Sequence, residues 1–277
     1  MKNSAYKSVN GFALISVLWV TAFLTVIAAS VSYQARASLG LANNVVANFK
    51  TKHAAEGAFY LTVEKLIKRD EQQGYVLKEP KFSYQQDGTT VYVEVTDESG
   101  KVDINLAPID LIRNLLITIG VNEKLSATIA DATGDWRDQD SLKRVDGAED
   151  QDYAASGLGY EAKDDEFDSI DELSLVFGMT PEIFKRVKPF ITVYAQDLGV
   201  NTALASTVVK NTVQGIRSAE FSEELISDYT TATGGLIYTL QIRAIDPSGF
   251  TTRITSIVRL QRGNTFEPFA ILGWKMS

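Results

Sequence analysis

The longest apolar stretch lies near the start of the chain. Residues 12–35, from Phe12 to the residue before Arg36, form a stretch of 24 residues without a formal charge. A helix rises about 1.5 Å per residue, so this stretch would reach about 36 Å as a helix. The hydrocarbon core of a bilayer is about 30 Å thick. The pattern therefore predicts a single transmembrane helix over residues 12–35.

Apolar positions continue at helical spacing after Arg36, as far as about Arg69. They fall in two groups, Leu41, Val45 and Phe49 followed by Phe59, Val63, Leu66 and Ile67. This spacing places apolar side chains on one face of a helix. We expect a sheet to lie against that face.

Two separate parts of the chain alternate apolar and polar residues, as strands do. The first is residues 90–96, which follow an Asp87-Gly88 turn, and the second is residues 236–274, interrupted by a turn at residues 246–249. About 130 residues between them lack this alternation. We expect an α+β fold, in which a long N-terminal helix packs on a small antiparallel sheet and a large α-helical subdomain is inserted between strands.

The expected organisation has five parts. They are a leader at residues 1–11, the transmembrane helix at 12–35, a helix with the first strands at 36–104, the inserted helical subdomain at 105–232 and the C-terminal strands at 233–277.

Helix-start signals punctuate the predicted insert. They are Pro108, a capping box of Ser169 and Glu172, and the pair Thr180-Pro181. Residues 102–107 also resemble residues 198–203, and each segment leads into a short apolar helix. These units resemble helix-hairpin-helix modules, which often hold DNA in other proteins.

Composition and charge narrow the possible functions. The chain has no Cys, which excludes disulfides and zinc knuckles, and its single His, His53, disfavours His-based catalysis. Residues 131–172 contain 15 acidic and 4 basic residues, whereas the rest of the chain contains 20 acidic and 23 basic residues. Because binding to a phosphate backbone needs Lys and Arg, the acidic insert argues against nucleic acid.

The acidic segment contains a group of carboxylates that are candidate ligands for calcium. Calcium prefers six to eight oxygen ligands from a flexible loop. The candidate ligands are Asp135, Asp138, Asp140, Glu149, Asp150 and Asp152. Their spacing differs from that of an EF-hand, so a solvated acidic loop without an ion explains the residues equally well.

A short basic leader precedes the apolar stretch. It carries Lys2 and Lys7 and ends at Gly11, so a cut between Gly11 and Phe12 would remove the leader and keep the anchor. A leader ending in Gly, then Phe and an apolar helix, resembles the type IV pilin and pseudopilin family. The resemblance implies cleavage by a prepilin peptidase, usually followed by methylation of the new amine of Phe12.

Position 16 departs from most of that family. Ser16 stands where major pilins carry a Glu, whose carboxylate pairs with the N-terminal amine of a neighbouring subunit. A subunit without this carboxylate suits the end of a filament. The resemblance then implies one kind of subunit in particular, the K-type minor pseudopilin of the type II secretion system.

Motifs in the insert resemble the K-type pseudopilins in the same order. They are Asp-Trp-Arg-Asp-x-Asp at residues 135–140, Gly-Ala-Glu at 147–149, residues 167–173 and residues 178–182. The resemblance implies a calcium-binding helical insert, and it carries calcium over to the six carboxylates named above. At Leu106 the family more often has a Thr that caps the next helix.

The resemblance implies a function without catalysis. The chain would cross the inner membrane once, with its globular part in the periplasm. It would join I-type and J-type minor pseudopilins at the pseudopilus tip, support pseudopilus initiation and protein export, and contact exoprotein substrates or the secretin. The alternatives are a minor pilin of a type IV pilus, a tethered DNA receptor and a calcium-dependent enzyme.

Overall fold

In the computed structural model of the chain, residues 10–72, 80–218, 229–231, 235–261 and 267–277 are described. The expected leader therefore lies outside the described residues, apart from Asn10 and Gly11, with which the first helix begins.

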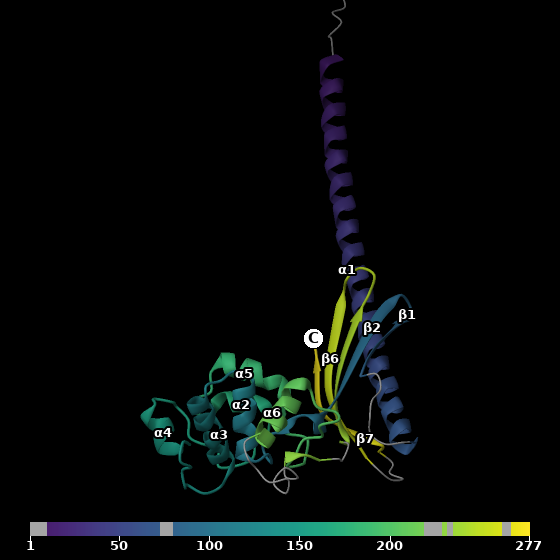
Figure 1. Cartoon of the computed structure of the whole chain (residues 1–277). Helices are drawn as coiled ribbons and strands as arrows, with labels where there is room; N and C mark the ends of the chain where they lie inside the picture. Colours follow the sequence, from purple (N-terminus) through teal and green to yellow (C-terminus); the bar gives the residue numbers. More distant parts are fainter. Residues whose placement is uncertain (1–9, 73–79, 219–228, 232–234, 262–266) are drawn as a thin grey trace, which may run out of the picture.

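The chain folds into one long helix, a sheet and a group of shorter helices (Figure 1). The helices are α1 (Asn10–Gln72), α2 (Ile109–Thr118), α3 (Glu123–Arg137), α4 (Asp150–Ala155), α5 (Pro181–Val187) and α6 (Thr207–Ser218), with 3-10 turns η1 (Glu98–Gly100), η2 (Ile170–Leu175) and η3 (Lys188–Phe190). The strands are β1 (Lys81–Gln86), β2 (Thr89–Asp97), β3 (Val102–Asp103), β4 (Ile191–Thr192), β5 (Ile237–Ile245), β6 (Thr251–Leu260) and β7 (Phe269–Met276).

Helix α1 has two halves with different surroundings. Its first half extends away from the rest of the molecule (Figure 1), and its apolar side chains are exposed from Phe12 onward. By length and composition this helix is able to cross a membrane. Its second half packs on the sheet, with Phe59 completely buried and Val63 nearly so. Small residues such as Ala55 and Ala58 allow the sheet to approach the helix closely.

The expected apolar face of α1 needs one correction. Leu41, Val45 and Phe49 are each about two-thirds exposed and do not meet the chain's own sheet. The contact with the sheet begins only near Thr51, whose hydroxyl lies 2.7 Å from that of Thr252 on β6. The sheet is shorter than the helix, so it covers only the C-terminal part of the apolar face.

Five antiparallel strands form the main sheet in the order β1-β2-β5-β6-β7. Strands β2 and β5 are neighbours although the whole insert separates them in sequence, and Asp97 at the end of β2 lies opposite Tyr238 at the start of β5. The two ends of the insert are therefore adjacent, as an insertion into a sheet requires. The core under the sheet combines α1 with Val93, Leu240, Ile242 and Val258.

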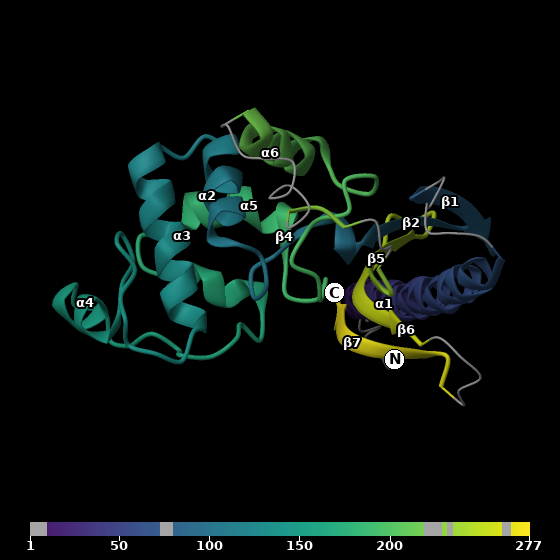
Figure 2. The ribbon, with the colours of Figure 1, turned by 60° about the horizontal axis from the view of Figure 1, so that its bottom comes forward.

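The insert has a separate core, built mainly by α2, α3 and α6. It lies beside one end of the sheet, on the side away from α1 (Figure 2). Leu111, Leu115 and Ile129 are completely buried in this core. Val102 and Ile104, which we expected in the part before the insert, also pack in it, because β3 pairs with β4.

The predicted internal repeat exists in a different register. Asp103 and Asn201 each accept, on a side-chain oxygen, a hydrogen bond from the backbone N–H two residues further on, at 2.9 and 3.0 Å. The backbone carbonyl of each also accepts the N–H four residues on. Residues 102–107 therefore correspond to residues 200–205, two positions away from the match that the sequence predicts.

Candidate metal centre in the acidic insert

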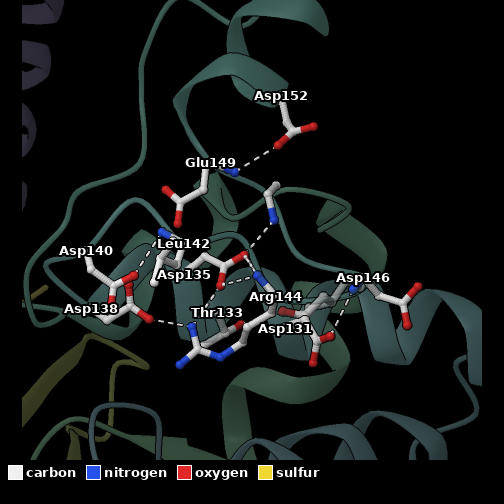
Figure 3. Close-up of polar contacts among 12 residues, drawn as sticks. Asp131, Thr133, Asp135, Asp138, Asp140, Leu142, Arg144, Asp146, Glu149 and Asp152 are labelled. Atoms are coloured by element: carbon white, nitrogen blue, oxygen red, sulfur yellow. Dashed lines mark hydrogen bonds and ion pairs between the residues drawn. The ribbon is translucent and has the colours of Figure 1, made fainter.

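Two buried aspartates of α3 organise the loop that follows the helix. Asp135 is completely buried and accepts hydrogen bonds from the backbone N–H of Ala148 at 2.8 Å and from the Arg144 guanidinium at 2.8 Å. Asp131 accepts the backbone N–H of Asp146 at 3.1 Å. Figure 3 shows these contacts holding the loop against α3. The two carboxylates therefore fix the shape of residues 144–148.

Gly147 allows the loop to approach this closely. A Cβ atom added there would lie 1.8 Å from Oδ2 of Asp135, which is far inside van der Waals contact. Gly134 has a similar role, because a Cβ there would lie 2.8 Å from the Arg144 guanidinium. The geometry of the loop thus depends on two glycines as well as on the carboxylates.

Three other predicted ligands are engaged in structural contacts. Asp138 forms an ion pair with Arg144 through one oxygen, and its other oxygen, Oδ1, is buried without a hydrogen-bond partner. Asp140 accepts the backbone N–H of Leu142 at 2.8 Å. Asp152 accepts the N–H of Glu149 at 3.0 Å, as part of the capping box of α4, and the Lys143 ammonium at 2.7 Å.

Carboxylates also converge at the start of α4. Oxygen atoms of Glu149, Asp150 and Asp164 lie within 4.8 Å of one another. Glu149 is 9% exposed, and its Oε1 is buried without a hydrogen-bond partner. Asp164 has a positive φ of 55°, and the N–H of Ala162 donates to Asp150 at 3.1 Å, which brings the second acidic loop to the first.

The electrostatics of this cluster are unfavourable without a cation. Burial, followed by repulsion from the carboxylates of Asp135 and Asp138, raises the pKa of Glu149 to about 7. The pKa of Asp164 is also raised, by burial and then by Asp150 and Asp138. Carboxylates that approach one another in this way are stabilised by a bound metal ion.

The donor set fits calcium. Glu149, Asp150 and Asp164 supply hard oxygen ligands, and the unpartnered Oδ1 of Asp138 belongs to the same electrostatic group. Backbone carbonyls and water complete such a coordination shell in many calcium sites. Among the residues predicted as ligands, the structure brings Glu149 and Asp150 together, whereas Asp135, Asp140 and Asp152 make the structural contacts described above.

Asp164 was missed by sequence reasoning. It belongs to the run Asp164-Asp165-Glu166, which contributed to the charge of the segment but lies 12 residues beyond the last predicted ligand, Asp152. The fold returns this second loop to the start of α4, and the sequence alone does not show that return. A run of acids with a residue able to adopt positive φ is the signal that was available.

The predicted processing residues lie at the start of α1. Gly11 and Phe12 fall in its first turn, and Phe12 is 77% exposed. The hydroxyl of Ser16 donates to the backbone carbonyl of Phe12 at 2.9 Å. The polar group at position 16 is therefore satisfied within its own helix and carries no charge for a neighbour.

Comparison with known proteins links the insert to one family. Residues 95–196 match the family model for type II secretion system (T2SS), protein K. The predicted resemblance to K-type pseudopilins is thereby confirmed.

Individual relatives extend this match over more of the chain. Type II secretion system protein K of Pseudomonas aeruginosa is 27% identical over 223 residues, which is 72% of this chain and 66% of the relative. The Klebsiella pneumoniae protein K is 25% identical over 69% of this chain and 66% of its own length. The Dickeya chrysanthemi protein K is 34% identical over 95 residues, 33% of this chain. The matches to the first two relatives thus span just under two thirds of their length.

A solved structure shares the fold. A chain of the GspK-GspI-GspJ complex from the type 2 secretion system of enterotoxigenic Escherichia coli matches with a TM-score of 0.65 and 14% identity. The match covers 82% of this chain and 96% of that chain. The expected α+β fold, with a long N-terminal helix and an antiparallel sheet, is confirmed.

Proposed function

We propose that this chain is a minor pseudopilin of the type II secretion system, a structural subunit and not an enzyme. One observation carries the proposal: the large helical insert between β2 and β5, on a long helix packed against a sheet. Most of the segment that matches protein K lies in the insert, and the fold is shared with a chain of the GspK-GspI-GspJ structure. A minor pilin of a type IV pilus is not favoured, because the curated relatives carry the protein K name.

We place the subunit at the tip of the pseudopilus. The insert lies beside the sheet and adds a bulk that a subunit stacked on that side would meet (Figure 2). Ser16, bonded within its own helix, offers no carboxylate to the amine of another subunit. Both features suit a subunit that stands at the tip of a filament and takes part in the initiation of its assembly.

The I-type and J-type minor pseudopilins are the partners that follow from this position. The exposed apolar side chains Leu41, Val45 and Phe49 of α1 give such partners a surface that the chain's own sheet leaves open. Purified chain in detergent, mixed with the I-type and J-type subunits of the same secretion system, should form a complex of defined stoichiometry in light scattering. Failure to bind either subunit would contradict the proposal.

Calcium is the proposed structural ion of the insert. Glu149, Asp150 and Asp164 would hold it, and the ion would neutralise carboxylates that otherwise repel one another. Isothermal titration should detect calcium binding that Asp164→Asn weakens at least tenfold. Glu161→Gln, an exposed acid of the same segment, is the matched control and should leave the affinity unchanged.

Processing and location complete the proposal. A prepilin peptidase would cut between Gly11 and Phe12, and the new amine of Phe12 would be methylated. Helix α1 would then hold the chain in the inner membrane, with the sheet and insert in the periplasm, where exoproteins and the secretin are found. Mass spectrometry of the mature chain tests both modifications, because removal of residues 1–11 and addition of one methyl group change the mass by defined amounts.

A further inference from the structure

The face of the sheet opposite α1 carries a basic groove. It has a volume of about 500 Å³ and is lined by side chains or backbone of β1, β2, β5 and β6. The charged residues that line it are Lys81, Glu94, Arg243 and Arg253. Lys81 and Glu94 form an ion pair at 2.8 Å, so the two arginines supply the net charge of the groove.

Arg243 and Arg253 stand directly opposite each other on β5 and β6. Arg253 exchanges its backbone hydrogen bonds with Ser277 on the other side of β6, at 2.7 and 2.9 Å. Arg243 and Arg253 are therefore a non-hydrogen-bonded pair, whose Cα atoms lie about 4.5 Å apart and whose side chains are close. Like charges at such positions destabilise a sheet.

Among the described residues, neither arginine is paired with an Asp or Glu carboxylate that would offset this repulsion. Within the described part of the chain, no ion pair joins Arg243 or Arg253 to an Asp or Glu. Both side chains are exposed. The Arg243 guanidinium lies 4.7 Å from the centre of the Tyr92 ring, the residue opposite it on β2, which holds the cation in place before any ligand arrives.

The position of the groove favours a protein ligand over a lipid surface. The groove lies beside the part of the sheet joined to α1 through Thr51 and Thr252. Thr51 is 15 residues beyond Arg36, or about 22 Å along the helix. This distance exceeds the Debye length of about 8 Å at physiological salt, so lipid headgroups at the end of the span would be screened from the arginines.

A second groove continues from the first toward the insert. It has a volume of about 330 Å³ and shares Lys81 and Glu94 with the basic groove. Phe190, Leu204 and Val209 of the insert line it. The two grooves form one track, basic toward the hairpin turns of the sheet and partly apolar toward the insert.

We propose that this track binds an extended acidic segment of a partner protein. Carboxylates on alternate residues of such a segment would face Arg243 and Arg253 and form charge-assisted hydrogen bonds with the two guanidinium groups. The carboxylates would attract both arginines and so offset the repulsion between them. An apolar residue that follows the acidic residues of the segment would enter the groove toward the insert. This inference does not depend on the calcium site or on the assignment to the pseudopilus tip.

A fluorescent peptide tests the proposal. The probe is three Glu-Ser repeats followed by Leu, and the same peptide with Gln in place of Glu is the uncharged control. Fluorescence anisotropy with the full chain in neutral detergent should show binding of the Glu peptide that weakens as salt is raised, and about tenfold weaker binding of the Gln peptide.

Variants locate the binding. The double variant R243Q/R253Q should weaken binding of the Glu peptide about tenfold, whereas R36Q/R259Q, with the same loss of charge elsewhere, should leave it unchanged. The variant R243K/R253K keeps the charge and should retain most of the binding. Unfolding midpoints of all variants should stay at or slightly above that of the parent chain, because the arginines are exposed and repel each other.

Three results would overturn the proposal. The first is equal binding of the Glu and Gln peptides at concentrations up to 1 mM. The second is binding of the Glu peptide to R243Q/R253Q as tightly as to the parent chain. The third is binding of the chain to anionic lipid vesicles that depends on the two arginines when peptide binding does not.

Discussion

Replacing Glu149 by Gln should stabilise the metal-free protein at pH 8 and reduce its response to calcium. The pKa of Glu149 rises from 4.5 to about 7 on folding, because the side chain is buried among other carboxylates. Folding thus favours the protonated form. The stability that this group contributes is complete below pH 4.5 and is lost as the pH rises through 7.

The size of the effect follows from the shift. One pKa unit corresponds to about 1.4 kcal/mol, so ionised Glu149 lowers the free energy of unfolding by about 3 kcal/mol at pH 8 relative to its neutral form. Gln has the same shape and no charge, so E149Q should recover about 1–3 kcal/mol in the presence of a chelator. In calcium the order should reverse, because the parent chain alone keeps the full set of ligands.

Urea unfolding followed by tryptophan fluorescence measures both effects. Trp136 belongs to the insert core, and its ring lies 5.9 Å from that of Tyr153 in α4. Measurements at pH 5 and pH 8, with calcium and with chelator, separate the charge effect from the ion, and Glu161→Gln is the control. The reasoning is refuted if E149Q is less stable than the parent chain in chelator at pH 8, or if calcium stabilises both chains equally.

Three further predictions concern the same structure. Gly147→Ala should lower the free energy of unfolding by roughly 2–4 kcal/mol, because its Cβ would collide with Asp135. Gly159→Ala, where a Cβ meets nothing within 4 Å, should have a far smaller effect in the same urea titration. Equal effects of the two substitutions would contradict the loop geometry. Phe59→Ala should cost about 3–5 kcal/mol, whereas the neighbouring, 60% exposed Tyr60 should tolerate Ala with a small loss, as thermal unfolding would show. Calcium affinity measured by titration calorimetry should fall as the pH is lowered below about 7, since protons compete for Glu149, and an affinity independent of pH from 5 to 8 would exclude Glu149 as a ligand.

Sequence patterns predicted much of the fold, because its periodicities are strong. The valines of residues 91–95 are buried on one face of β2, and the capping box at Ser169 and Glu172 forms, although it opens a 3-10 turn rather than an α-helix. Strand β1, Lys81–Gln86, was implied only by the hairpin turn at Asp87-Gly88, and its residues were not predicted. Its composition is mostly polar, and it pairs only with β2 at the edge of the sheet, so little burial marks it in the sequence.

Features that depend on contacts distant in sequence were harder to predict. The apolar face at Leu41, Val45 and Phe49 has the same spacing as the buried face at Phe59 and Val63, and only the length of the sheet distinguishes them. The acidic cluster shows the same limit. The sequence placed Glu149 and Asp150 among six candidate ligands, but Asp164 approaches them through the return of a second loop, and Asp135 is occupied by a guanidinium and backbone N–H groups.

The position of the subunit in the filament is the most direct test of the central claim. Pseudopili assembled with an epitope-tagged chain would be labelled with gold-conjugated antibody and imaged by electron microscopy. The account predicts gold at one end of each filament and none along its length. Gold distributed along the filaments would contradict it, because the chain would then stack as an ordinary subunit despite its insert and Ser16.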